Sequence, residues 1–204
     1  MISRNVNYSF IIFILGLGLG IFFALHKPLW NDELYTQILT IQPHSYKDIL
    51  SSHFTEGNNN PLFYLLQKFN GDLWHFYYPH PFHPWMYELS PQALLILRIP
   101  SIFYIALSIA LIFYFFIQYF SKWTALYSLL ICLSTPSLIV FWVDARPYAL
   151  WFLLTTIQLL VFLRLKIILP VTEKTYSKGL INSFNNCITF EPYNNNKPYQ
   201  HHYY

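Results

Sequence analysis

Charged side chains are scarce in this sequence. Only 10% of its 204 residues are Asp, Glu, Lys or Arg, whereas soluble proteins average about 25%. So few charges cannot cover a water-facing surface of this size, which makes a lipid bilayer the expected solvent. Basic runs are also missing, and the net charge of +3 is too small to favour a nucleic-acid partner.

Cysteine is nearly absent as well. Cys132 lies in an apolar segment and Cys187 in a polar one, so the two are not expected to pair, and no disulfide framework is implied.

A small-residue cleavage site is missing after the first apolar run, which ends at Phe23-Ala24-Leu25-His26-Lys27. A membrane span is therefore favoured there over a cleaved signal peptide, which stays open as the alternative.

What the sequence has instead is long apolar runs and many aromatic residues. A helix needs about 20 predominantly apolar residues to cross a bilayer. The sequence therefore predicts an all-α, polytopic membrane protein with about four transmembrane helices, at residues 6–25, 99–120, 124–143 and 149–169. We expect the glycines near position 18 to permit close helix packing, and Pro136 to kink the third span. Residues 171–204 are polar, rich in asparagine and expected to be disordered.

The first loop, residues 26–98, is the largest polar region before this tail. Two short helices are predicted in it, one capped by Asn31 or Asp32 and one beginning at Pro61 and stopping at Asn70-Gly71. The second carries an apolar stripe at helical spacing, made by Leu62, Leu65, Leu66 and Phe69. Such a helix either lies in the membrane interface or packs on a core outside the membrane.

Orientation follows from the basic residues near the span ends. With the N-terminus in the cytoplasm, seven basic residues lie on the cytoplasmic side and five outside, and the long first loop holds only three lysines. The positive-inside rule therefore places the loop at residues 26–98 outside. A bacterial inner membrane is the expected location.

Four short features carry groups that could perform chemistry. Each also has an ordinary explanation: acids at a helix start complement its dipole, a capped helix begins with Asn-Pro, arginine anchors a span end, and neighbouring opposite charges close a loop. In chain order the features are Asp32-Glu33, Asn60-Pro61-Leu62-Phe63-Tyr64, Arg98-Ile99-Pro100-Ser101 and Asp144-Ala145-Arg146-Pro147-Tyr148.

Together and in this order, the four features resemble the C-type (GT-C fold) membrane glycosyltransferases. The closest likeness is to the bacterial branch related to protein O-mannosyltransferases and the lipid A aminoarabinose transferase. In that family an acidic pair follows the first span, a Pro-Leu-aromatic segment opens a loop helix, Arg-x-Pro-Ser begins a later span, and an acidic-x-Arg-x-Tyr turn joins two spans. The resemblance covers residues 8 to about 165, so residues 1–170 are expected to form the N-terminal part of such a domain.

The resemblance implies transfer of a sugar from a polyprenyl-phosphate-linked donor to an acceptor glycan, lipid or protein at the outer face of the membrane. Asp32 is then the expected base for the acceptor hydroxyl, and Glu33 supports it or binds a divalent metal, the one cofactor considered. Arg98 or Arg146 steadies the leaving phosphate, and the choice between them stays open. The remaining substrate-binding candidates are Asn60, Asp144 and Tyr148.

The sequence also departs from this family. Asn59 and Asn60 stand where many members have His or Pro, and Asp144 stands where Glu is common. Family members carry more spans and a further domain, so a truncated piece of such an enzyme is expected. The alternative is a catalytically inactive remnant or a non-enzymatic membrane assembly protein.

Overall fold

The computed structural model describes residues 2–51, 61–76 and 90–167, and every regular element in these ranges is helical. The all-α prediction is therefore confirmed. In chain order the elements are α1 (Ile2–His26), α2 (Asn31–Tyr35), the π-helix η1 (Thr36–Ile41), α3 (Tyr46–Leu50), α4 (Pro61–Leu73), α5 (Pro91–Tyr119), α6 (Lys122–Leu133), α7 (Pro136–Trp142) and a last helix at Tyr148–Ile167.

The chain divides into two compact units, Met1–Leu160 and Val161–Tyr204. All of the packing below belongs to the first unit. Of the second unit, residues 161–167 are described, and they are the final turns of the last helix, with Arg164 and Lys166 exposed. The tail expected to be disordered, residues 171–204, lies outside the described residues.

Three helices are long and apolar enough to cross a membrane: Asn5–His26, Pro91–Tyr119 and Tyr148–Ile167. Helices α6 and α7 form a fourth candidate, bent by 74° at the break before Pro136. The protein is therefore an integral membrane protein, and the predicted proline kink in the third span is present as a complete break. The second span differs from its expected start at residue 99: α5 begins at Pro91, where the Ser90 hydroxyl accepts a hydrogen bond from the Ala93 amide at 3.2 Å.

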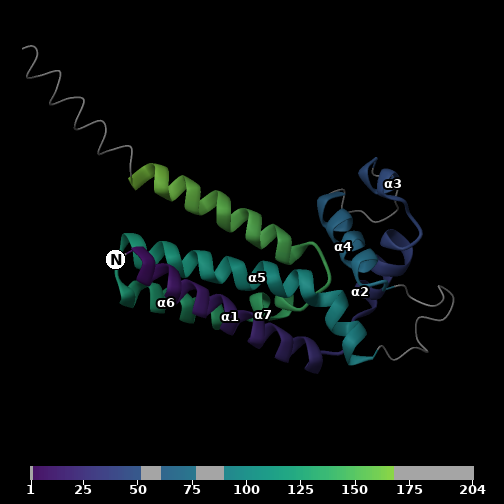
Figure 1. Ribbon diagram of the computed structural model, residues 1–204, viewed down its shortest axis with the longest axis horizontal. Helices are drawn as coiled ribbons and strands as arrows, with labels where there is room; N and C mark the ends of the chain where they lie inside the picture. The colour runs from purple at the N-terminus through teal and green to yellow at the C-terminus, as the bar shows by residue number, and fades with distance from the viewer. Residues whose placement is uncertain (1, 52–60, 77–89, 168–204) are drawn as a thin grey trace, which may run out of the picture. The chain divides into compact units, whose positions relative to one another are not determined.

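Helices α1 and α5 lie side by side along most of their length (Figure 1). Glycine makes this approach possible at two positions. A Cβ on Gly16 would lie 3.1 Å from the Ala106 Cβ, and one on Gly20 would lie 2.6 Å from a methyl carbon of Ile102. Gly18 points elsewhere, with nothing within 4 Å of its notional Cβ. The prediction that glycines near position 18 permit close helix packing is therefore confirmed for Gly16 and Gly20, but not for Gly18.

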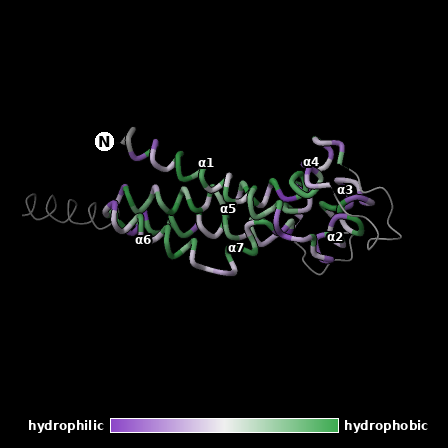
Figure 2. The backbone as a smooth tube through the Cα atoms, turned by 90° about the horizontal axis from the view of Figure 1, so that it is seen from below, coloured by the Kyte–Doolittle hydropathy of each residue, from purple (hydrophilic) through white to green (hydrophobic). Residues whose placement is uncertain are grey.

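The short helices in the described part of the first loop are more polar than the spanning helices. Figure 2 shows α1, α5 and α6 mainly in the hydrophobic colour, whereas hydrophilic residues gather along α2, α3 and α4. Helix α2 begins at Asn31 as expected, but the N-cap residue is Trp30 rather than Asn31 or Asp32. Leu34 and Ile38 form a small buried cluster from this segment.

Proline explains how α4 attaches to α5. Pro100 lies inside α5 and has no N–H to give to the Ile96 carbonyl four residues earlier. The Asn70 side-chain amide of α4 donates to that carbonyl at 2.8 Å instead. One residue on, the Gln67 amide donates to the Leu97 carbonyl at 2.7 Å. Helix α4 is thereby fixed beside the turn of α5 that carries Arg98.

Candidate functional site

A fully buried ion pair joins α2 to α5. Glu33 and Arg98 are both 0% exposed, and the carboxylate receives two hydrogen bonds from the guanidinium, from Nε at 3.1 Å and from Nη2 at 2.8 Å. The same carboxylate accepts from the backbone amide of Ala145 at 2.9 Å and from that of Trp30 at 3.1 Å. Each Glu33 oxygen therefore already holds two hydrogen bonds, which is close to the capacity of a carboxylate.

Arg98 uses its remaining N–H groups to close the end of α1. Its Nη1 donates to the carbonyls of Ala24 and Lys27, both at 2.8 Å, and its Nη2 donates to that of Pro28 at 3.0 Å. The Ala24 carbonyl needs an outside donor because its helical partner would be the N–H that Pro28 lacks. All five N–H donors of the guanidinium therefore make hydrogen bonds. Through the Glu33–Arg98 pair, α1, α2, α5 and the loop after α7 are connected by buried hydrogen bonds.

Asp32, the neighbour of Glu33 in sequence, points the other way. Its side chain is 63% exposed, and its carboxylate lies 2.8 Å from Nη1 of Arg146, whose side chain is 18% exposed. An open cleft of about 450 Å³ lies at this carboxylate, lined by Leu29, Trp30, Asn31 and Asp32. The exposed Asp32 carboxylate therefore lines the cleft and is paired with the partly exposed guanidinium of Arg146.

A third ion pair closes the site from the loop after α7. The Lys27 ammonium binds the buried Asp144 carboxylate and also lies 4.9 Å from the centre of the Trp30 ring. Burial raises the pKa of the Asp144 carboxyl above its ordinary value, while the hydrogen bond and charge of Lys27 act to lower it. The backbone carbonyl of Asp144 accepts a hydrogen bond from the Ser101 hydroxyl. The loop is thus fixed to both α1 and α5.

The structure therefore brings together three of the four sequence features. Asp32-Glu33, Arg98 and the Asp144–Tyr148 turn lie within hydrogen-bonding or ring distance of one another, with the Tyr148 ring 5.7 Å from the Arg146 guanidinium. The expected alternative of an internal Asp144–Arg146 pair is wrong, since each residue pairs with a different helix end. Asn60 lies outside the described residues.

The arrangement does not favour a metal at the acidic pair. Within the described ranges there is no group of three or more His, Cys, Asp or Glu that could hold an ion. Both Glu33 oxygens are occupied by Arg98 and backbone amides, so binding a cation there would break a buried ion pair. Of the two acids in Asp32-Glu33, only Asp32 has an exposed carboxylate that could contact a ligand.

Sequence reasoning missed two residues of this site. Lys27 entered only as a charge near a span end, yet it binds Asp144. Trp30 was not singled out, yet its half-exposed ring forms one wall of the cleft. The sequence did contain a signal for Lys27. This cation directly follows the end of the first span, and Pro28 and the acidic pair Asp32-Glu33 come shortly after it.

Comparisons with protein-family models, with curated proteins and with solved structures found no match to this chain.

Proposed function

We propose that this chain is a C-type membrane glycosyltransferase, or a part of one, that transfers a sugar from a polyprenyl-phosphate-linked donor to an acceptor hydroxyl at the membrane surface. The observation that carries the proposal is an ion pair: the exposed Asp32 carboxylate, which lines an open cleft after the end of α1, is paired with the partly exposed Arg146 guanidinium. Removal of the acceptor's proton needs a base, and a cation stabilises the departing phosphate, so these two groups could supply both functions.

The neighbouring acids divide the work. Asp32 accepts the proton of the acceptor hydroxyl as that oxygen attacks the anomeric carbon, because its carboxylate is exposed at the cleft. Glu33 contacts neither substrate, since its oxygens are taken up inside the protein. It is a positioning residue that fixes α2, and with α2 the backbone of Asp32.

The two arginines divide in the same way. Arg98 is 0% exposed and has every N–H group engaged, so it has none to offer a phosphate. Arg146 is partly accessible and is paired with Asp32, which lines the cleft, so it is the cation that stabilises the leaving phosphate. Phosphate binding at Arg146 would compete with Asp32 for the guanidinium and release the carboxylate to act as the base.

The test is transfer of a labelled sugar from polyprenyl phosphate in membranes containing the protein. Asp32→Asn keeps the size of the side chain but cannot accept the proton, so transfer should fall by about a hundred- to ten-thousand-fold. Arg146→Lys keeps the charge but loses the two-pronged geometry and should weaken donor use. Asp72→Asn, a change on α4 away from the residues lining the cleft, is the matched control and should retain transfer.

Membrane insertion and thermal stability of each variant must be measured beside transfer. Wild-type transfer by Asp32→Asn would reject the assignment of the base. A wild-type chain that inserts and folds yet transfers no sugar, alone or with the products of neighbouring reading frames, would favour the non-enzymatic assembly role.

A further inference from the structure

Helix α4 presents chemically different sides to its surroundings. The side toward α5 carries the two amides of Gln67 and Asn70, whose hydrogen bonds go to the carbonyls of Leu97 and Ile96. Both side chains are at least nine-tenths buried. The inward side of α4 therefore combines two hydrogen-bonded amides with the buried rings of Phe63 and Tyr64.

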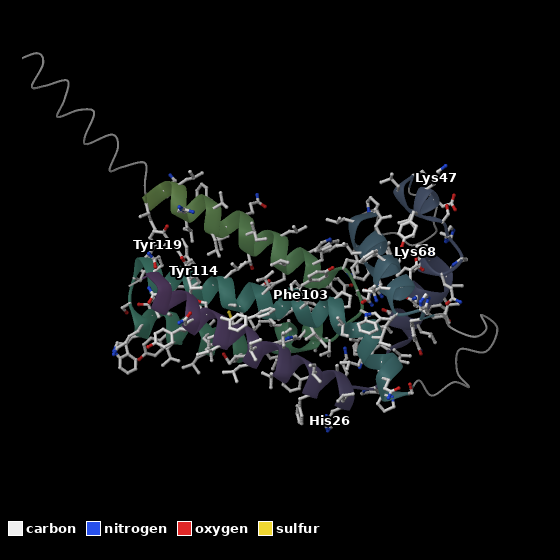
Figure 3. All side chains as sticks on the ribbon, viewed as in Figure 1. His26, Lys47, Lys68, Phe103, Tyr114 and Tyr119 are labelled. Carbon is white, nitrogen blue, oxygen red and sulfur yellow. The ribbon has the colours of Figure 1, made fainter. Side chains whose placement is uncertain are left out.

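The charged residues of α4 face α3. Lys68 places its ammonium 5.5 Å from the centre of the Tyr46 ring, and the Tyr46 hydroxyl donates to Asp72 at 2.6 Å. Figure 3 shows Lys68 and Lys47 together on this pair of helices. Lys68 and Asp72, the charged residues of α4, therefore both lie on the side of the helix that faces α3 and not on its outward side.

The outward side of α4 is apolar. Leu62, Phe69 and Leu73 are 42%, 59% and 60% exposed, and at 3.6 residues per turn they fall within an arc of about 40°. Leu65 and Leu66 flank this stripe and are half-buried. The name outer stripe is used below for Leu62, Phe69 and Leu73.

On a water-soluble protein, the apolar residues of a helix face the core and its polar residues face water. Helix α4 departs from this pattern on its outward side: Phe63 and Tyr64 are buried beside the two amides, but leucine and phenylalanine are exposed as well. A helix that hides its amides and exposes leucine and phenylalanine suits an apolar surrounding. The apolar pattern seen in the sequence is divided in the structure: Leu65 and Leu66 pack against a buried cluster that includes Phe63 and Tyr64, whereas Leu62 and Phe69 are exposed.

We propose that the outer stripe of α4 is immersed in bilayer lipid, so that α4 lies in the acyl–headgroup boundary.

Lipid is favoured as the occupant because α4 is bound directly to a spanning helix. At 29 residues α5 is about 43 Å long, whereas the hydrocarbon core is about 30 Å thick. The apolar span was expected to begin at residue 99, so the surplus turns are those of residues 91–98, where α4 is attached, and we place them at headgroup depth. Trp74, 52% exposed after the end of α4, suits the same level. This inference is independent of any transfer chemistry.

The test uses nitroxide spin labels on single cysteines in the full chain, reconstituted in phospholipid vesicles, with Cys132 and Cys187 replaced by alanine and serine. Labels at positions 62, 69 and 73 should collide much more with oxygen, which concentrates in lipid, than with a water-soluble nickel complex. Lys68→Cys on the α3 side of the same helix is the matched control and should show the opposite preference. Only variants with the thermal unfolding midpoint of the parent are compared.

A second measurement uses the unaltered protein, so it does not depend on how variants fold. A phospholipid with a photoactivatable acyl chain should cross-link to the segment from Leu62 to Leu73, with adducts on the outer stripe. Preferential nickel collision at the stripe would mean that it faces water, and would overturn the proposal. Weak collision with both reagents, together with no lipid adducts, would mean that protein covers the stripe, and would overturn it equally.

Discussion

Asp32 and Glu33 are adjacent in the chain but occupy opposite environments. The first turn of α2 directs one carboxylate to the cleft and the other into the protein, with side chains 63% and 0% exposed. The sequence could predict that an acidic pair begins a helix. It could not predict which acid is buried, because this depends on Arg98, 65 residues away in the chain, and on the Ala145 amide.

This division predicts opposite effects on stability. Glu33→Gln should leave the buried Arg98 guanidinium without its counter-charge and lower the free energy of unfolding by about 3–5 kcal/mol. Asp32→Asn removes an exposed partner and should change it by less than about 1 kcal/mol. Thermal unfolding of both variants in one detergent measures the difference. Equal effects on stability would contradict the separation of the two roles.

At the scale of elements, proline sets the points where distant segments join. Pro28 and Pro100 each leave a carbonyl without its helical partner, at Ala24 and Ile96. In both cases a side chain from far along the chain supplies the donor, Arg98 for the first and Asn70 for the second. The prolines and the freed carbonyls could be identified in the sequence, but the donors could not, because many polar side chains of the first loop were candidates.

A double-mutant cycle tests this dependence between elements. Asn70→Ala should leave the Ile96 carbonyl unpaired and lower stability by about 1–3 kcal/mol. Pro100→Ala restores a backbone N–H to that carbonyl, so adding Asn70→Ala to it should cost clearly less. The four proteins are compared by thermal unfolding. If the cost of Asn70→Ala is the same in both backgrounds, the amide does not substitute for the missing N–H.

The glycines of α1 give a second test at this scale, with a matched control in the same helix. Gly20→Ala places a Cβ 2.6 Å from a methyl carbon of Ile102 and 2.8 Å from the Trp142 indole nitrogen. It should destabilise the protein by about 1–3 kcal/mol through overpacking. Gly18→Ala meets nothing within 4 Å and should be neutral or stabilise α1 by up to about 1 kcal/mol. A destabilising Gly18→Ala with a tolerated Gly20→Ala would contradict the α1–α5 interface.

At the scale of the whole molecule, hydrophobic run length predicted the membrane class and the approximate spans, because a bilayer imposes one strong constraint on every crossing helix. Boundaries were less predictable. The start of α5 at Pro91 was missed. Arg98 was taken to mark the beginning of the second span, so the apolar residues 93–97 before it were assigned to the loop. The Asp32–Arg146 and Lys27–Asp144 pairs needed the three-dimensional packing of α1, α5 and the loop after α7.

That packing also predicts how the broken third span crosses the membrane. At one end of the α1–α5 pair, the Asn5 side-chain amide donates to Gln118 at 3.2 Å, shortly before α6 begins. At the other end, Asp144 binds Lys27. Helices α6 and α7 therefore lead from one end of the pair to the other despite their 74° bend. We therefore expect the two helices to make one crossing, since a re-entrant loop would return to the side where α6 begins.

Single cysteines labelled by a membrane-impermeant reagent in intact cells test this crossing, in a chain lacking Cys132 and Cys187. One crossing by α6 and α7, followed by the last helix, puts Lys122→Cys and Lys174→Cys on the same side. Lys47→Cys, in the loop after α1, should lie on the opposite side. We expect labelling at position 47 alone, with the other two labelled only after permeabilisation, because the positive-inside rule predicts a cytoplasmic N-terminus. Opposite behaviour of positions 122 and 174 would show that α6 and α7 return to the side from which they entered.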